Sequence, residues 1–185
     1  MSVNIQLEWT PNPSTLKYVV DRTLLPRGAV NFTTRESAQE RSPLASRLFD
    51  IEGVVGVMVG SNFVTVTKGE HGEWDILNDT VMAALDGHLS GDEPVVVGDI
   101  ASGHTTGAPG SSIEDQIRAI LDNEIRPAVM QDGGDITLDR YENGIAFVHM
   151  RGSCSGCPSS TATLKMGIET RLREVIPELI EVVPV

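Results

Sequence analysis

The sequence predicts an α+β protein that consists of two small mixed α/β domains joined by a flexible linker. Its 185 residues, of which 40% are hydrophobic, are enough to form two small cores. Both halves contain alternating segments typical of strands and apolar stripes with helical spacing. A segment rich in Gly, Ser, Pro and Thr lies between them. We therefore predict a first domain over residues 1–90, a linker over 91–111 and a second domain over 112–185.

The first domain is predicted to combine four strands with two helices. Prolines 11 and 13 separate the first two strands, because proline cannot donate to a strand ladder. Ser42-Pro43 is a cap followed by a first-turn proline, and it begins a helix. Gly60-Ser61-Asn62 has the composition of a hairpin turn. In chain order, the predicted elements are strands at 4–9 and 16–20, a short helix from Pro43, strands at 53–59 and 63–67, and a helix from Trp74 to Gly87.

The second domain is predicted to have the order helix, strand, strand, cysteine loop, helix, strand. Ser111 and Glu114 have the spacing of a capping box, and the helix that follows is predicted to run up to Pro127. Residues 132–135 (DGGD) turn the chain, and residues 142–144 (ENG) are typical of a hairpin turn. The remaining predicted elements are strands at 136–141 and 145–150, a helix at 162–176 and a strand at 179–183.

Charge and hydropathy exclude several kinds of partner. The chain has 14 basic and 26 acidic residues, which gives a formal net charge of −12. Such a chain repels polyanions, so we expect no nucleic-acid partner. No apolar run approaches the ~20 residues of a membrane span, and the N-terminus has neither a signal-peptide core nor an Arg-rich presequence. We therefore expect no membrane partner and a cytoplasmic location.

The chain has two cysteines, Cys154 and Cys157, which form a C-x-x-C motif. They follow a predicted strand and precede a predicted helix, so we expect both sulfurs on an exposed loop. Pro158 suits the first turn of that helix, and Ser159 or Ser160 is the expected cap. The unpaired amides at a helix start favour thiolate over thiol, so both thiols are expected to lose their protons easily. These two cysteines are the candidate site residues.

Three chemistries use a C-x-x-C motif. A structural zinc site needs four ligands, and the nearest histidine, His149, is expected to be a structural strand residue. A thiol-disulfide oxidoreductase places the motif at a strand-to-helix turn, and the motif alone does not separate this activity from metal binding. An iron-sulfur cluster normally takes four thiolates, which two copies of this chain supply together. An interaction adaptor with incidental cysteines is a further alternative.

Longer motifs give a family resemblance. The sequences at 132–135 (DGGD), 152–160 (GSCSGCPSS) and 163–169 (TLKMGIE) resemble the C-terminal NifU domain, and the match covers about residues 112 to 185. In the first half, the chain resembles the N-terminal domain of Nfu-type proteins over about residues 4 to 88. The motifs that carry this second likeness are residues 10–13 (TPNP), 42–45 (SPLA), 48–49 (LF) and 63–68 (FVTVTK).

The resemblance implies an iron-sulfur cluster carrier or scaffold that is not an enzyme. In such a protein, Cys154 and Cys157 from two subunits bind a [4Fe-4S] cluster, so a homodimer is expected when the cluster is bound. Four thiolates also suit a [2Fe-2S] cluster. The implied partners are apo iron-sulfur proteins and the cluster assembly machinery. The first domain has no cysteine, and the resemblance implies that it recognises partners.

Overall fold

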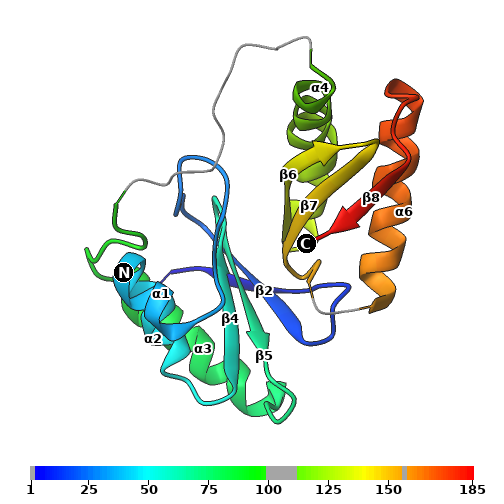
Figure 1. The fold of residues 1–185 in the computed structure, drawn as a ribbon. Helices are drawn as coiled ribbons and strands as arrows, with labels where there is room; N and C mark the ends of the chain where they lie inside the picture. The colour runs from blue at the N-terminus through cyan, green and yellow to red at the C-terminus, as the bar shows by residue number, and fades with distance from the viewer. Residues whose placement is uncertain (1–2, 99–111, 156–157) are drawn as a thin grey trace. The chain divides into compact units, whose positions relative to one another are not determined.

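The computed structural model describes residues 3–98, 112–155 and 158–185. The chain forms two compact units on either side of residues 99–111 (Figure 1). Each unit combines helices with a sheet of its own, so the predicted α+β class with two sheets is confirmed. Among the described residues, no helix is long and apolar enough to cross a bilayer.

The N-terminal unit contains a five-stranded sheet with the strand order β1-β2-β5-β4-β3, and every neighbouring pair is antiparallel. Three helices accompany the sheet. The elements are β1 (Ile5–Trp9), β2 (Thr15–Val20), β3 (Val30–Phe32), α1 (Arg35–Arg41), α2 (Pro43–Phe49), β4 (Val54–Val59), β5 (Phe63–Lys68) and α3 (Trp74–Leu89).

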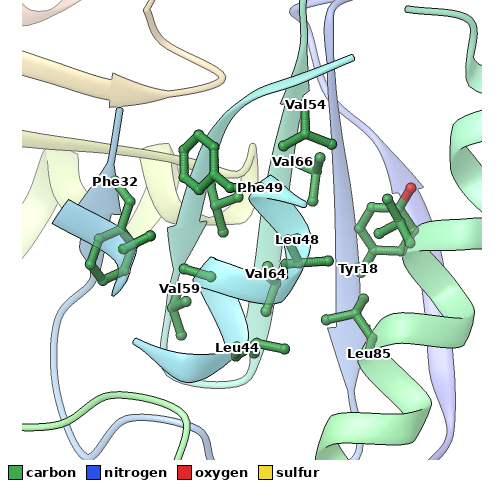
Figure 2. Packing of buried hydrophobic residues seen from close by; sticks show 14 of the residues in the cluster. Tyr18, Phe32, Leu44, Leu48, Phe49, Val54, Val59, Val64, Val66 and Leu85 are labelled. Atoms are coloured by element: carbon green, nitrogen blue, oxygen red, sulfur yellow. The ribbon is translucent and has the colours of Figure 1, made fainter. Parts of the chain in front are cut away.

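The core of this unit forms where α2 and α3 lie against the central strands (Figure 2). Leu44 and Leu48 are four residues apart on α2, so they extend from the same side of the helix into the core. Leu85 from α3 is also fully buried. These helical side chains meet the strand residues Val59, Val64 and Val66.

The predicted strands, the hairpin and the two helices of this unit are confirmed, but two elements were missed. β3 has three residues, which is too short for an alternating pattern to show. α1 buries Ala38 alone and so has no apolar stripe. α3 was predicted to end at Gly87 and instead continues to Leu89. Nothing lies within 4 Å of the position of the missing Cβ of Gly87, so no close contact requires glycine there, and the helix continues through it.

The segment after α3 stays attached to the N-terminal unit, although the sequence assigned it to the linker. Ser42 donates a hydrogen bond of 2.5 Å to the carbonyl of Val95, and the amide of Val97 donates one of 2.7 Å to the carbonyl of Arg41. His88 is fully buried, and its Nε2 lies 3.3 Å from the carbonyl oxygen of Pro94. Residues 94–97 therefore form a strap over the junction of α1 and α2.

The C-terminal unit contains a three-stranded sheet with the order β6-β7-β8. β6 and β7 form an antiparallel hairpin, and β7 pairs with β8 in parallel after the chain crosses over through α6. Asn143 and Gly144 both have positive φ values of 53° and 83°, as the tight predicted turn requires. The elements are α4 (Ile113–Ile120), the π-helical turn η1 (Leu121–Ile125), α5 (Arg126–Gln131), β6 (Gly134–Glu142), β7 (Ile145–Gly152), α6 (Pro158–Val175) and β8 (Glu181–Pro184).

The first helix of this unit does not end at Pro127 as the sequence predicted. A proline inside an α-helix loses one hydrogen bond and clashes with the preceding turn. Here the chain widens into the π-helical turn, in which the amide of Arg126 bonds to the carbonyl of Leu121, five residues earlier. The helix then continues as α5. Its start also differs from the prediction, because Ser112 is the cap and accepts from the amide of Asp115, while Ser111 lies outside the described residues.

Candidate functional site

Cys154 lies in the turn between β7 and α6, where the sequence predicted the cysteine loop. Gly152 begins the turn with a φ of 63°, and its carbonyl accepts hydrogen bonds from the amide (3.1 Å) and the hydroxyl (2.8 Å) of Ser155. The hydroxyl of Thr161, on the first turns of α6, donates to the carbonyl of Cys154 at 3.1 Å. Cys157 lies outside the described residues. The structure therefore describes the environment of Cys154.

The side chain of Cys154 packs against Gly134, the first residue of β6. A Cβ built on Gly134 would lie 2.2 Å from the sulfur of Cys154 and 3.2 Å from Cγ1 of Val129. Any side chain at position 134 would therefore displace this sulfur. Gly133 has a φ of 76° and makes the predicted turn. The second glycine has a role that the sequence did not predict, which is to leave room for the sulfur.

Hydrogen bonds hold the cysteine turn against the turn at residues 132–135. The amide of Ser153 donates to the carbonyl of Gly133 at 3.2 Å, and its hydroxyl donates to the carbonyl of Asp132 at 2.5 Å. Gly134 and Gly152 are also partners in the β6–β7 ladder. Two motifs that are twenty residues apart in the sequence therefore form one local structure.

A buried ion pair lies beside these turns. Arg126 Nε is 2.6 Å from Asp135 Oδ1, and Arg126 Nη2 is 3.0 Å from Asp135 Oδ2. Asp135 is 0% exposed and Arg126 is 8% exposed. Burial alone would lower the pKa of Arg126, but its bonds to Asp135 and Asp122 outweigh this and raise it. This pair was not predicted. Asp135 was assigned to the turn before a predicted strand, and no pattern in the sequence connects it with Arg126.

The electrostatic surroundings of Cys154 differ from the expectation. The side chain is 6% exposed, so the predicted exposed sulfur is wrong for this cysteine. The pKa of the Cys154 thiol is raised to about 11, mainly by burial; the hydrogen bond with Ser153 lowers it, and the charges of Asp132 and Asp135 add to the increase. The prediction that this thiol loses its proton easily is therefore also wrong. A buried, protonated thiol is a poor nucleophile, which disfavours the thiol-disulfide oxidoreductase alternative.

His149, the nearest histidine to the cysteines in the sequence, has structural partners. His149 lies on β7, with Nδ1 3.1 Å from the carbonyl oxygen of Val185 and Nε2 3.2 Å from Asp139 Oδ1. Within the described ranges, no group of three His, Cys, Asp or Glu side chains could hold a metal ion. α6 begins at Pro158, so Ser159 and Ser160 lie inside its first turn and are not its cap.

Comparison with known proteins extends to both units. Residues 5–92 match the family model described as "Scaffold protein Nfu/NifU N terminal", and residues 117–183 match the "NifU-like domain". The human protein named "NFU1 iron-sulfur cluster scaffold homolog, mitochondrial" is 39% identical over 176 residues, which is 95% of this chain and 69% of that protein. "NifU-like protein 4, mitochondrial" from Arabidopsis thaliana is 40% identical over 180 residues, which is 95% of this chain and 63% of that protein.

A solution structure of a NifU-like protein from Saccharomyces cerevisiae covers 51% of this chain and 85% of its own, with 22% identity and a TM-score of 0.46. The relatives in humans, Drosophila virilis and Arabidopsis thaliana are all named mitochondrial, which points to the mitochondrion and makes the expected cytoplasmic location wrong. These relatives are named as iron-sulfur cluster scaffolds or NifU-like proteins. Because family models match both units and the human relative is 39% identical over most of this chain, the chain belongs to the Nfu family of NifU-like proteins.

Proposed function

We propose that this protein carries or assembles an iron-sulfur cluster and passes it to apo-proteins, without acting as an enzyme. The proposed ligands are Cys154 and Cys157 from two copies of the chain, and the proposed cargo is a [4Fe-4S] cluster. The partners would be the assembly machinery that delivers iron and sulfide, and the apo iron-sulfur proteins that receive the cluster. The scaffold names of the relatives support this function.

The observation that carries the proposal is the incomplete ligand set. The chain has two cysteines in all, and the described residues offer no group of three metal-binding side chains elsewhere. A cluster normally requires four thiolates, so one chain provides half of a site. A site that two copies complete lies near a surface and can open when they separate. This arrangement favours transfer of the cluster to another protein over permanent binding.

The surroundings of Cys154 would protect its thiol from oxidation in the cluster-free chain. Oxidation of a cysteine depends on its exposure and on its thiolate fraction. The sulfur of Cys154 is buried against Gly134, so it meets oxidants slowly while no cluster is present. To act as a ligand, this side chain would have to leave its contact with Gly134.

The N-terminal unit would serve the same function without binding the cluster. It contains no cysteine, so it supplies no thiolate ligand. It has a separate sheet and a separate core. We assign partner recognition to this unit.

Anaerobic reconstitution with iron and sulfide tests the proposal. The wild-type chain should bind a cluster, whereas Cys154→Ser and Cys157→Ser should each lose it, as measured by absorbance and by iron content. His149→Gln is the matched control, because it removes the nearest alternative ligand and leaves both thiols, and it should bind cluster like the wild type. Full cluster binding by Cys154→Ser would contradict the proposed ligand set.

A further inference from the structure

The N-terminal unit exposes an apolar and acidic surface around the first turn of α3, and its own core does not use this surface. Two surface hollows flank this turn, of about 630 Å³ and about 250 Å³. A third, more polar hollow of about 600 Å³ lies at the same turn and is lined by Glu73, Trp74 and Asp75. We call this surface the α3 rim, and its residues are Glu52, Val55, Glu70, Glu73, Asp75 and Ile76.

Three glycines line the larger hollow, and two of them have little room for a side chain. A Cβ on Gly69 would lie 3.1 Å from Cγ1 of Val55, and a Cβ on Gly72 would lie 3.0 Å from Cδ1 of Leu77. The amide of Gly69 donates to the carbonyl of Gly53 at 2.8 Å, and the amide of Gly72 donates to the carbonyl of Gly69 at 3.1 Å. These bonds fix the loop, so the hollow is formed before anything binds in it.

Apolar side chains are exposed beside both hollows. Val55 is 51% exposed and Ile76 is 71% exposed at the larger hollow, and Trp9 is 75% exposed at the smaller one. In the described part of the N-terminal unit, four of the five exposed large hydrophobic side chains line these two hollows, Leu7 being the fourth. Exposed apolar side chains that gather in one place, beside polar ones, are typical of a binding surface.

The charge of the α3 rim indicates what it binds. Its four carboxylates are exposed, and none of them makes an ion pair with another side chain in the described ranges. Lys68 lines the more polar hollow, and His71 lines both that hollow and the larger one. Glu73 and Asp75 also lie at the positive end of α3 and stabilise the helix. Glu52 and Glu70 lie outside this helix, so helix stabilisation does not account for them.

We propose that the α3 rim binds a segment of a partner protein in which apolar side chains are flanked by Lys or Arg. Apolar side chains of the segment would enter the larger hollow between Val55 and Ile76. Its cations would pair with Glu52, Glu70 and Glu73, which attract a basic segment before contact. The proposal does not depend on the cysteines, because the α3 rim lies in the unit that has none.

A peptide titration of the cluster-free full chain tests the proposal. The probe is a synthetic helix-forming peptide of about 14 residues, with Leu along one face and Lys or Arg on the others. One comparison peptide has Glu in place of the basic residues, and another has Ala in place of Leu. Amide NMR shifts should move at residues 53–55 and 69–77 with the first peptide and stay in place with the other two.

Variants of the chain locate the site. Val55→Ser and Ile76→Ser should each weaken binding of the basic apolar peptide by about fivefold or more, as expected for an apolar contact at the centre of an interface. The pair Glu52→Gln and Glu70→Gln should weaken binding and reduce its dependence on salt. The matched control is the pair Glu36→Gln and Glu40→Gln on α1, which removes the same charge from exposed positions elsewhere in the unit.

Three results would overturn the proposal. The first is an absence of saturable shifts at the α3 rim, and the second is equal weakening by the α1 control pair, which would indicate attraction to net charge alone. The third is self-association of the chain without peptide that Ile76→Ser abolishes, which would assign the surface to a second copy. Unchanged tryptophan emission of each variant would show that the unit remains folded, because Trp9 and Trp74 both lie in it.

Discussion

The two units of this chain differ in what they bury. The N-terminal unit buries a large set of apolar side chains between its sheet and helices. Its buried lysine, Lys17, reaches Glu8 at the surface, at a distance of 2.8 Å. In the C-terminal unit, the buried ion pair of Arg126 and Asp135 lies beside the turns that hold Cys154.

This difference indicates that the buried groups of one unit serve stability and those of the other serve the proposed function. Buried charges are costly, and a buried pair is a weak source of stability compared with apolar packing. The C-terminal unit has such a buried pair where the cysteine turn and the 132–135 turn meet. The N-terminal unit leaves its unused apolar and acidic side chains at the surface. We infer that the buried pair of the C-terminal unit helps to hold one sulfur in place. The apolar packing of the N-terminal unit instead provides a stable fold.

Removal of one member of the buried pair should have the largest effect. Asp135→Asn keeps the side-chain volume but leaves Arg126 without its main counter-charge, so the C-terminal unit should lose about 3–5 kcal/mol of unfolding free energy. Urea titration followed by methyl NMR signals of Ile136 and Val148 measures this loss. Tryptophan emission follows the N-terminal unit separately, and its transition should not move.

The matched control is Asp139→Asn. Asp139 pairs with Arg140 at 2.6 Å near the surface, and an exposed pair of this kind contributes under about 1 kcal/mol. If Asp135→Asn cost no more than Asp139→Asn, the buried pair would not support the cysteine turn as described.

A methyl group at position 134 should have the next largest effect. Gly134→Ala places a carbon where the sulfur of Cys154 lies, and overpacking of this kind costs about 1–3 kcal/mol. Displacement of the sulfur should also increase the rate at which Cys154 reacts with iodoacetamide in the cluster-free chain. Mass spectrometry of the digested protein measures that rate for Cys154 alone.

Gly167→Ala is the control in the same unit. Gly167 lies inside α6 with nothing within 4 Å of its missing Cβ, so alanine should stabilise the unit by about 0.5–1 kcal/mol and leave the alkylation rate unchanged. Equal alkylation rates for Gly134→Ala and the wild type would contradict the role assigned to Gly134.

The smallest effect should be a pH dependence of the unfolding free energy of the N-terminal unit. Burial lowers the pKa of His88, with Arg47 acting in the same direction and Pro94 and Glu93 opposing it. The folded pKa is below the unfolded value of about 6.5, so the unfolded chain binds more protons between the two. The contribution of neutral His88 to the free energy of unfolding is complete above about pH 6.5 and decreases as the pH falls toward the folded pKa.

Urea unfolding followed by tryptophan emission at pH 7.5 and pH 5.5 measures this change. His88→Gln should unfold with a weaker pH dependence than the wild type. His71→Gln is the control, because His71 is exposed, and it should keep the wild-type pH dependence. An unchanged pH dependence in His88→Gln would contradict the buried neutral histidine under the strap.

Elements set by local pattern could be predicted from the sequence. The Asn143-Gly144 hairpin and the strands around it depend on turn chemistry and alternation, which neighbouring residues determine. The passage of the helix through Pro127 could not be predicted, because tertiary packing on both sides decides whether the chain stops or widens into a π-helical turn.

At the cysteine site, too, the features that depend on tertiary packing could not be predicted. The position of Cys154 between a strand and a helix follows from its neighbours and was predicted. Its burial depends on Gly134, twenty residues earlier, and its raised pKa depends partly on the charges of Asp132 and Asp135. The contact of Arg126 with Asp135 is likewise a product of the fold. The residues next to Cys154 predict a helix-start environment for its sulfur, whereas residues that bury it and raise its pKa lie about twenty positions earlier in the chain.

Native mass spectrometry under anaerobic conditions tests most directly whether two copies of the chain complete one cluster site. The reconstituted protein should give a species of two chains with about four iron and four sulfide atoms, and the cluster-bound single chain should be absent. A single chain that carries a complete cluster would contradict the account.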